Sequence, residues 1–440
     1  MNSSAAIHIS DISQMIKEVE QTYKKHLNEN DIDDHVVIVN NSGGKDSGAT
    51  DLLAKSIIGD NYRSVAADTG NEHPLTIQHL KILHEQRGGN PVEIVQADYP
   101  QELFDKRKKS VIKGWSGKQA ILAGKYRGIL MPSLSNPDTK FAEAWRKQAK
   151  RIGMGEFTAP IDAFLHAFHR TGNPFLDMTL LHGGFPLGRQ RFCTQELKID
   201  VVFNKVIRPL LDECKTVIQW SGVRADESEK RASYQRFSHD NRDKAGDLYN
   251  FLPIHKWTAA DVFSIYKYFG VTPNPLYTQG MARVGCMPCI LVNKEELSEI
   301  AARFPDEINR VDQWEKQIAM VSRWVHWMMV GHIDRRQFKP IVSQFYVNMD
   351  ISDECIRDHL EPKKYAQKLG VNSRLIHRDF RLLTEQYTGT SMLGPRGDGD
   401  IFSIYDAIEW AKTGRGGKVY DLVKASLDVE VCGSKYGLCG

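Results

Sequence analysis

The stretch with the clearest chemical content is Ser42-Gly43-Gly44-Lys45-Asp46-Ser47. The apolar run Val36–Val39 before it predicts a buried strand, and residues 48–55 after it predict the first turns of a helix. Glycines let the backbone approach an anion closely, while a helix N-terminus offers free N–H groups and a positive dipole, to which Lys45 adds a charge. The segment is shorter than a Walker A loop and does not end in Gly-Lys-Ser/Thr. We therefore expect a cradle for phosphate groups, with a chance Ser-Gly-Gly turn as the alternative.

A second chemical signal is the pair Cys286 and Cys289, whose spacing can place two thiolates on one metal. A single pair of this kind is weak by itself. The chain has seven cysteines, an odd number, and an N-terminus without the charged-then-apolar pattern of a signal peptide. This argues against a disulfide framework and leaves metal binding, redox chemistry or inert buried thiols.

The elements that must position these residues alternate between strand and helix. A lead-in helix is expected over residues 11–28, and a second helix over 75–87, opened by His73-Pro74. Further strands are expected over the following ranges: 62–67, 92–97, 217–224 and 252–254. Such alternation predicts an α/β fold with a doubly wound, mostly parallel sheet, in which ligands bind at the carboxyl ends of strands. Both the 42–47 segment and Asp68-Thr69-Gly70 fall at such ends.

The remaining sequence divides the chain into four parts. We expect residues 1–100 to form the first half of a nucleotide-binding domain and 189–292 the second half, with the cysteine pair. Between them, 101–188 is rich in Lys, Arg and aromatic residues and carries helical patches at 140–152 and 160–169, so we expect an inserted helical subdomain. Residues 293–440 are expected to form a helical C-terminal region, with helices over 296–304 and 307–330.

Composition sets broad limits on the class of protein. The 440 residues are 41% apolar and 26% charged, which is ordinary for a soluble globular protein. No apolar run is long enough to span a membrane, so we expect a cytoplasmic protein with no membrane partner. The formal net charge of +3 is too small to indicate a nucleic-acid partner from bulk electrostatics alone.

Five ordered motifs accompany the 42–47 loop, at 68–74, 191–198, 220–231, 253–262 and 274–289. Their sequences are Asp-Thr-Gly-Asn-Glu-His-Pro, Arg-Phe-Cys-Thr-Gln-Glu-Leu-Lys, Trp-Ser-Gly-Val-Arg-Ala-Asp-Glu-Ser-Glu-Lys-Arg, Pro-Ile-His-Lys-Trp-Thr-Ala-Ala-Asp-Val, and Asn-Pro-Leu-Tyr through Gly-Cys-Met-Pro-Cys. Together with the loop they resemble the phosphoadenosine phosphosulfate (PAPS) reductase-like branch of the PP-loop ATP pyrophosphatase superfamily. In character the chain is most similar to the ATP pyrophosphatases of DNA phosphorothioation. The resemblance does not cover the insertion or the chain after about residue 292.

The resemblance implies a nucleotide site in which ATP binds with Mg²⁺. Its nucleotide-binding residues would be Ser42, Gly43, Gly44, Lys45, Asp46, Ser47, Asp68, Thr69, Gly70, Lys198, Gly222, Arg224 and Glu227. Its catalytic residues would be Lys45, Asp46, Arg224 and Arg231, the arginines suiting bidentate binding of phosphate or sulfate. Asp46 would hold Mg²⁺ or only stabilise the helix start. Glu227 would pair with an arginine or cap a helix with Ser228, and Lys198 would approach the phosphates or remain solvated.

The resemblance also implies a [4Fe–4S] cluster ligated by Cys193, Cys286 and Cys289. The family's second cysteine in the 191–198 motif is replaced by Thr194. A fourth ligand would be one of Cys214, Cys355, Cys432 and Cys439, or would be absent, leaving one iron open to sulfide. Structural zinc, reduced structural thiols and a redox pair are the alternatives.

Three functions compete. The first is an ATP pyrophosphatase that adenylylates an acceptor for sulfur transfer, with a sulfur donor such as a cysteine desulfurase. The acceptor could be DNA or RNA, because basic and aromatic residues interleave between 106 and 151, although a solvated helical face would give the same pattern. The second is a PAPS or adenylyl-sulfate reductase, and the third a non-enzymatic nucleotide-binding regulator. The complete loop favours ATP, since reductases of this branch usually carry a degenerate one.

Overall fold

The computed structural model of the chain describes residues 9–112, 160–188, 190–213, 215–241, 246–330, 391–393 and 403–413. It divides into two compact units. The first combines residues 1–98, 191–307 and 417–440, and the second combines 99–190 with 308–416. The insertion and most of the C-terminal region, which the sequence assigned to separate parts, therefore group together.

Within the described residues, six strands of the first unit form one sheet in the order β3-β2-β1-β4-β6-β5. The strands are β1 (Val36–Asn40), β2 (Tyr62–Asp68), β3 (Glu93–Gln96), β4 (Val217–Ser221), β5 (Phe237–Asp240) and β6 (Leu248–Phe251). All neighbours pair in parallel except β5, which lies antiparallel to β6 at the edge. The strand order reverses between β1 and β4, and this is where a doubly wound sheet opens a ligand crevice. The predicted fold class is confirmed.

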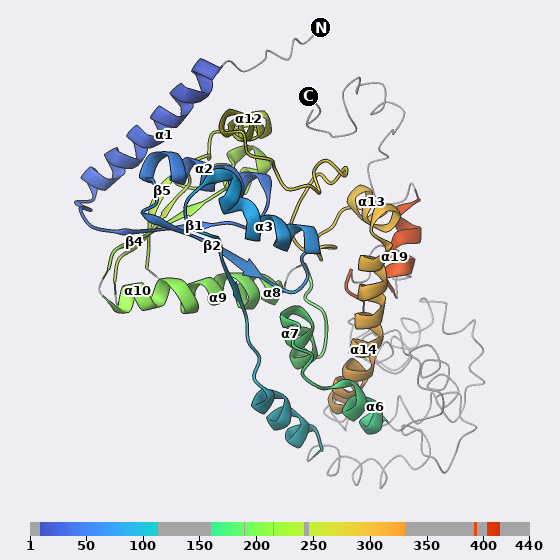
Figure 1. Ribbon diagram of the computed structural model, residues 1–440. Helices are drawn as coiled ribbons and strands as arrows, with labels where there is room; N and C mark the ends of the chain where they lie inside the picture. The colour runs from blue at the N-terminus through green and yellow to red at the C-terminus, as the bar shows by residue number, and fades with distance from the viewer. Residues whose placement is uncertain are drawn as a thin grey trace, which may run out of the picture. The chain divides into compact units, whose positions relative to one another are not determined.

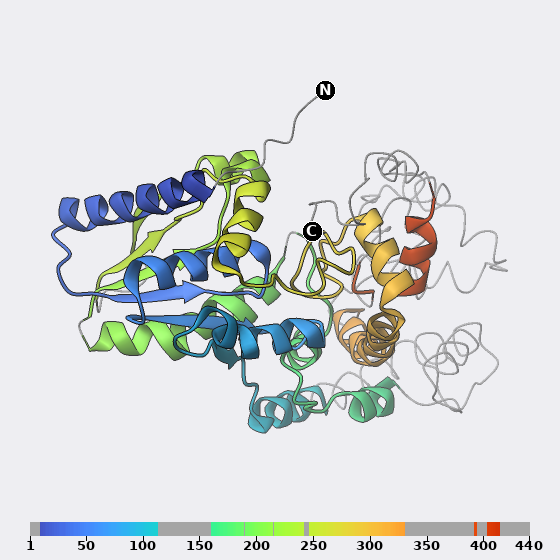
Figure 2. The same cartoon turned by 45° about the horizontal axis from the view of Figure 1, so that its top comes forward.

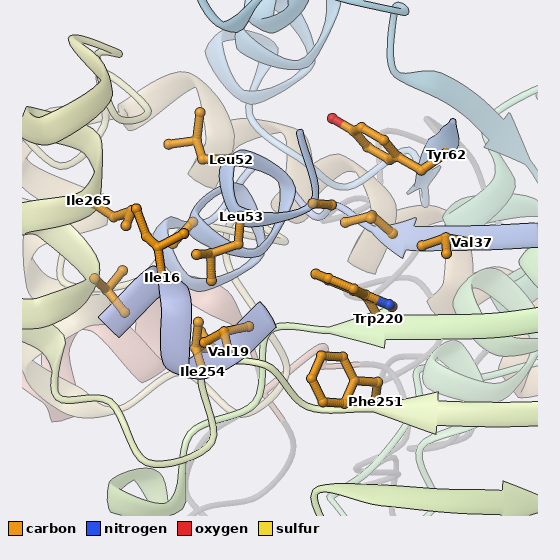
Figure 3. Close-up of a cluster of buried hydrophobic side chains, with 14 of the residues drawn as sticks. Ile16, Val19, Val37, Leu52, Leu53, Tyr62, Trp220, Phe251, Ile254 and Ile265 are labelled. Atoms are coloured by element: carbon orange, nitrogen blue, oxygen red, sulfur yellow. The ribbon is translucent and has the colours of Figure 1, made fainter. Parts of the chain in front are cut away.

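Helices cover both faces of this sheet (Figures 1 and 2). The helices α1 (Ile9–Glu29), α2 (Lys45–Ile58), α3 (Pro74–Arg87) and α12 (Ala259–Phe269) contribute to one core cluster, which includes Trp220 and Phe251 (Figure 3). On the other face, Ile38 and Val65 pack with apolar residues between 201 and 211. These residues belong to a longer helical stretch over 192–212. It comprises α8 (Phe192–Thr194), α9 (Asp200–Val202) and α10 (Arg208–Asp212), joined by π-helical turns at Gln195–Ile199 and Phe203–Ile207.

The predicted strand at 252–254 is wrong. The strand β6 ends at Phe251, one residue before this range, and the chain turns there. Pro253 has no N–H to donate to a sheet ladder, which explains the end of the strand. The edge strand β5 was not predicted, because Ser238, His239 and Asp240 give it little of the apolar alternation typical of a strand.

The second unit is helical where it is described. It contains a helix over residues 101–112, α6 (Pro160–Ala167), α7 (Pro174–His182), α19 (Ile404–Ala411) and most of α14 (Pro305–Val330), while α13 (Lys294–Arg303) belongs to the first unit. Phe175 of α7 stacks on Trp314 of α14, with ring centroids 5.5 Å apart. The predicted helical patch at 140–152 lies outside the described residues.

None of the helices described here combines the length and the apolar composition that crossing a membrane requires.

Candidate nucleotide and thiol site

The 42–47 loop lies where the sequence predicts it: residues 42–44 form the turn after β1, and residues 45–47 begin α2. Gly43 has φ = 72°, and a Cβ there would lie 2.7 Å from the Thr76 side chain, so the turn requires glycine. The Asn41 side chain accepts the Gly43 N–H at 3.0 Å, and Ser47 Oγ accepts the Ser42 N–H at 3.1 Å. These contacts fix a tight turn whose helix begins at Lys45.

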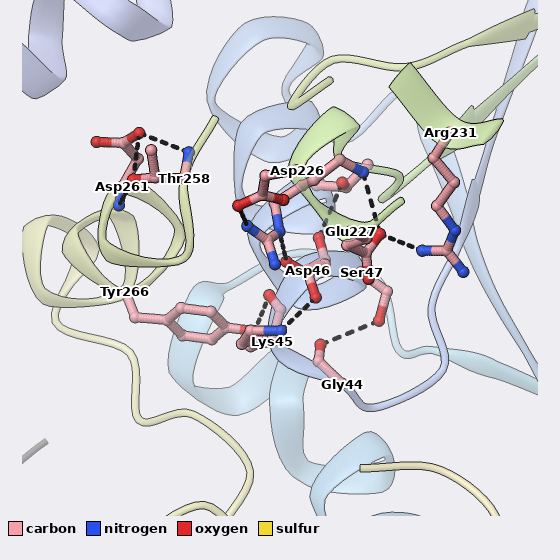
Figure 4. Close-up of polar contacts among 12 residues, drawn as sticks. Gly44, Lys45, Asp46, Ser47, Asp226, Glu227, Arg231, Thr258, Asp261 and Tyr266 are labelled. Carbon is pink, nitrogen blue, oxygen red and sulfur yellow. Dashed lines mark hydrogen bonds and ion pairs between the residues drawn. The ribbon is translucent and has the colours of Figure 1, made fainter. Parts of the chain in front are cut away.

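Two cations converge on Asp46 at the start of α2 (Figure 4). Lys45 Nζ donates to Asp46 Oδ2 at 2.6 Å, and Arg224 Nε donates to Asp46 Oδ1 at 2.6 Å. Lys45 and Arg224 are both buried, with 7% and 5% exposure. Charges that are removed from water in this way interact strongly, so the loop presents paired buried charges suited to polyphosphate and a divalent cation.

The loop after β4 approaches the loop after β1 closely. A Cβ on Gly222 would lie 2.6 Å from the Asp46 carbonyl carbon and oxygen and 2.8 Å from Ser47 N. Only a residue without a side chain allows this approach. Arg224 is thereby brought from a position 178 residues away in the chain to Asp46.

Arg231 and Glu227 form an ion pair beside this loop. The Glu227 carboxylate also accepts the Arg224 N–H at 3.3 Å, while Ser228 Oγ accepts the Arg231 N–H at 3.3 Å and caps α11 (Glu229–Ala232). Both arrangements considered for Glu227 and Ser228 are thus present together. Arg231 is 43% exposed at its side chain, so its guanidinium remains accessible to a ligand.

The loop after β2 is held by its own carboxylates. Asp68 Oδ1 accepts the Gly70 N–H at 2.8 Å. Glu72 accepts the Thr69 N–H at 2.8 Å and the Thr69 hydroxyl at 2.7 Å. Glu72 was not predicted as a site residue, although it stands within the Asp-Thr-Gly motif segment.

The three predicted cysteine ligands gather around Lys198. Cys193 and Cys286 each interact electrostatically with Cys289, and all three thiols interact with Lys198. Cys286 Sγ lies 3.5 Å from Glu72 Oε1, and Lys198 Nζ lies 4.0 Å from the same oxygen. Burial raises the pKa of Cys286 to about 12, with Lys198 opposing this effect. Lys198 thus lies beside Glu72 and interacts electrostatically with the three thiols, while its predicted role toward phosphates stays a prediction.

Cys193 of α8 and the two cysteines of a separate loop are near enough to interact electrostatically, and thiolates are the ligands that an iron–sulfur cluster would need. The candidate fourth cysteines Cys214, Cys355, Cys432 and Cys439 lie outside the described residues. In the described part of the chain, no group of three or more His, Cys, Asp or Glu side chains is arranged for a single metal ion.

The segment that carries Cys286 and Cys289 is bonded to both loops. Asn274 Nδ2 donates to the Gly43 carbonyl at 3.1 Å, and the Tyr277 hydroxyl accepts the Lys45 N–H at 2.8 Å. At its other end the Met287 N–H donates to the Asn71 carbonyl at 2.7 Å, and Asn71 Nδ2 donates to the Pro288 carbonyl at 3.0 Å. The phosphate loop and the thiols are thus parts of one hydrogen-bonded site.

Comparison with known proteins identifies the family of the chain. Residues 173–292 match the phosphoadenosine phosphosulfate reductase domain. An uncharacterised 37.8 kDa protein of Escherichia phage 186 is 34% identical over 404 residues, which cover 91% of this chain and 96% of the phage protein. The chain therefore belongs to the PAPS reductase-like branch of the PP-loop superfamily.

More distant relatives match over shorter stretches. An adenosine 5'-phosphosulfate reductase of Streptomyces coelicolor is 39% identical over 84 residues, which cover 19% of this chain and 34% of that enzyme. The crystal structure of a PAPS reductase from Candida auris in a phosphate complex aligns with a TM-score of 0.32 and 10% identity, covering 64% of this chain and 98% of that one. A score this low carries no inference about function.

Proposed function

We propose that this protein is an ATP pyrophosphatase that adenylylates an acceptor for sulfur transfer. The observation that carries the proposal is the complete 42–47 loop, hydrogen-bonded to the segment that bears Cys286 and Cys289. In a site for a nucleotide without a β,γ-pyrophosphate, part of this loop would have no phosphate group to bind. The family match to a reductase domain over residues 173–292 supports sulfur-related nucleotide chemistry as the class.

In the proposed reaction an acceptor oxygen attacks the α-phosphorus of ATP, and the bond from that phosphorus to the bridging oxygen breaks. Negative charge then grows on the departing pyrophosphate. The amides at the start of α2, the Lys45 ammonium and the Arg224 guanidinium are placed to stabilise that charge. Asp46 supplies the carboxylate through which Mg²⁺ would be held with the triphosphate.

A sulfur nucleophile then displaces AMP from the adenylylated acceptor. Cys193, Cys286 and Cys289 would hold a [4Fe–4S] cluster, which would supply a place to bind inorganic sulfide. Lys198 stays protonated beside the thiols, whose charges raise its pKa, and it offsets their negative charge. The sulfur would come from a donor such as a cysteine desulfurase, with a thiol reductant that releases its persulfide sulfur as sulfide.

A nucleic-acid acceptor is supported by one described feature. Lys106, Arg107 and Lys109 are exposed on the helix over residues 101–112, and Lys108 is partly exposed. Such a face can follow a phosphate backbone, although solvated basic helices are common. The other basic and aromatic residues of this stretch, up to 151, lie outside the described residues.

The proposal predicts that anaerobically purified protein converts Mg·ATP to AMP and pyrophosphate, with DNA, RNA and a desulfurase with cysteine tested as additions. Lys45→Ala and Asp46→Ala should each lower the rate by about 10²–10³-fold, because the first removes a positive charge beside the leaving pyrophosphate and the second removes the carboxylate that would hold Mg²⁺. Reduction of adenylyl sulfate or PAPS with thioredoxin, without turnover of ATP, would establish the reductase instead.

The cofactor is tested separately by iron, sulfide and zinc analysis of the same anaerobic preparation. Cys193→Ser, Cys286→Ser and Cys289→Ser should each lose most of the iron and the visible absorbance, since each removes one thiolate. Lys45→Ala is the matched control and should keep its iron. Stoichiometric zinc, or iron retained in all three variants, would contradict the cluster.

A further inference from the structure

Tyr277 is a site residue that no sequence motif explained. Its hydroxyl oxygen accepts the Lys45 N–H at 2.8 Å, across 232 residues of chain. The Tyr277 side chain is 3% exposed, and its ring contacts Phe263 of α12 edge-on, with centroids 5.7 Å apart. A buried tyrosine hydroxyl therefore accepts a hydrogen bond from the first amide of α2.

That amide is one of the groups that a bound phosphate would use. The first N–H groups of a helix have no acceptor within the helix. Gly44, the N-cap residue of α2, has no side chain to supply one. The Tyr277 hydroxyl is the neutral acceptor of the Lys45 N–H. A phosphoryl oxygen would be a charged acceptor and would form a stronger hydrogen bond with the same N–H.

The other cationic groups of the loop are paired in the same way. Lys45 Nζ is bound to Asp46, whose second oxygen is bound to Arg224. A polyphosphate entering this site must replace contacts that the protein makes with itself. Tyr277 lies in a turn, in which its N–H donates to the Asn274 carbonyl at 3.0 Å, so it can move without breaking a strand or helix.

We propose that the Tyr277 hydroxyl is a placeholder for a phosphoryl oxygen of the nucleotide, and that binding displaces it from the Lys45 N–H. The inference rests on the proposed function, because it requires a polyphosphate at this loop. Cys286 and Cys289 follow in the same segment. Displacement of Tyr277 by the nucleotide would therefore also affect the position of the two thiols. Tyr277 would thus act as a competitor of the ligand and not as a contact to it.

The test is whether removal of the Tyr277 hydroxyl strengthens or weakens the binding of polyphosphate. In titration calorimetry with Mg·ATP and with inorganic pyrophosphate, Tyr277→Phe should bind both about two- to tenfold more tightly than the wild type, since one hydrogen bond no longer opposes binding. Without ligand, the variant should unfold at a lower temperature. Unchanged or weaker binding would show that the hydroxyl is a permanent structural cap and would overturn the proposal.

Tyr266→Phe is the matched control. The Tyr266 hydroxyl is also buried and also bonds to Lys45, but it donates to the Lys45 carbonyl at 3.0 Å (Figure 4). A carbonyl oxygen has no hydrogen to donate, so a phosphate oxygen cannot take the place of the Tyr266 hydroxyl there. Its removal should leave the affinity unchanged or weaker. Equal tightening in both variants would indicate general loosening and would overturn the proposal.

A measurement on the wild type covers the case in which Tyr277→Phe fails to fold. Pyrophosphate should increase hydrogen exchange of residues 276–281 and decrease that of residues 42–47. A decrease in both segments would contradict displacement. If the wild type binds neither ligand, both the proposed function and the inference fail, whereas binding without these effects contradicts the inference alone.

Discussion

Asp46 is the residue on which the charges of the site converge. Its two oxygens accept from Lys45 and Arg224 at 2.6 Å each. A triphosphate would offer the same two cations stronger partners, and Mg²⁺ would offer Asp46 a new one. On the proposed function, nucleotide binding at this site would therefore be an exchange of partners among buried charges, in which the Asp46 carboxylate would stay neutralised.

Because the backbone approaches Gly222 closely, we expect that adding a single methyl group there, by Gly222→Ala, disturbs the site. Gly222→Ala should lower the free energy of unfolding by about 1–3 kcal/mol and weaken ATP binding, because the new Cβ overlaps the backbone of Asp46 and Ser47. Denaturant unfolding and calorimetry measure the two effects. Gly285→Ala is the control, since nothing lies within 4 Å of its Cβ position. Equal effects in both variants would contradict the account.

The sequence predicted those site residues that lie in continuous motifs. The 42–47 loop and the loop after β2 are read from local patterns, because a strand, a tight turn and a helix start are encoded by neighbouring residues. Tyr277 and Asn274 were quoted within a motif but given no role. Their partners Lys45 and Gly43 are more than 230 residues away, and local periodicity contains no information on such contacts.

Among the elements, α2 and α3 are joined by a buried ion pair. Arg87 at the end of α3 donates from Nε to Asp51 Oδ2 of α2 at 2.8 Å, and the two side chains are 1% and 0% exposed. Asn41 also donates to Asp51 at 3.1 Å, so the pair extends to the residue that holds the Gly43 amide. This network links the packing of two helices to the shape of the phosphate loop.

Removing one member of this pair should be costly. Arg87→Met should lower the free energy of unfolding by about 3–5 kcal/mol, because it leaves the Asp51 carboxyl buried without its cation. Chemical denaturation measures the loss, and the double variant with Asp51→Asn should recover part of it.

The exposed pair of Lys24 and Glu20 serves as the comparison. Lys24→Met should cost no more than about 1 kcal/mol, as is usual for surface pairs. A similar loss for Arg87→Met and Lys24→Met would show that the α2–α3 pair does not hold the elements together.

At the scale of the whole molecule, the chain forms two units, and each has polar contacts that hold its own elements together. In the second unit, buried Glu315 of α14 accepts the Met392 N–H at 2.9 Å, the Ser391 hydroxyl at 3.0 Å and the Ile404 N–H at 2.8 Å. One carboxylate thus holds α14 to two segments that are distant in the chain. No sequence pattern indicated this role, because a single Glu in a helix is usually a surface residue.

Glu315 gives the second unit a pH dependence. Burial raises the pKa of Glu315 from 4.5 to about 7. Between these values the folded state binds more protons than the unfolded state, so the stability contributed by this group is present below pH 4.5 and is lost as the pH rises through 7. Thermal unfolding from pH 5 to pH 8 should show this fall in the wild type. Glu315→Gln should flatten it, while Glu409→Gln at an exposed carboxylate should not.

The most direct test of the central claim is the product analysis of Mg·ATP turnover by the anaerobic wild-type protein and by Lys45→Ala. With DNA or RNA as acceptor and a cysteine desulfurase with cysteine and a thiol reductant as sulfur source, the account predicts equal amounts of AMP and pyrophosphate from the wild type and almost none from the variant. Formation of ADP and phosphate, or reduction of adenylyl sulfate with no turnover of ATP, would contradict it.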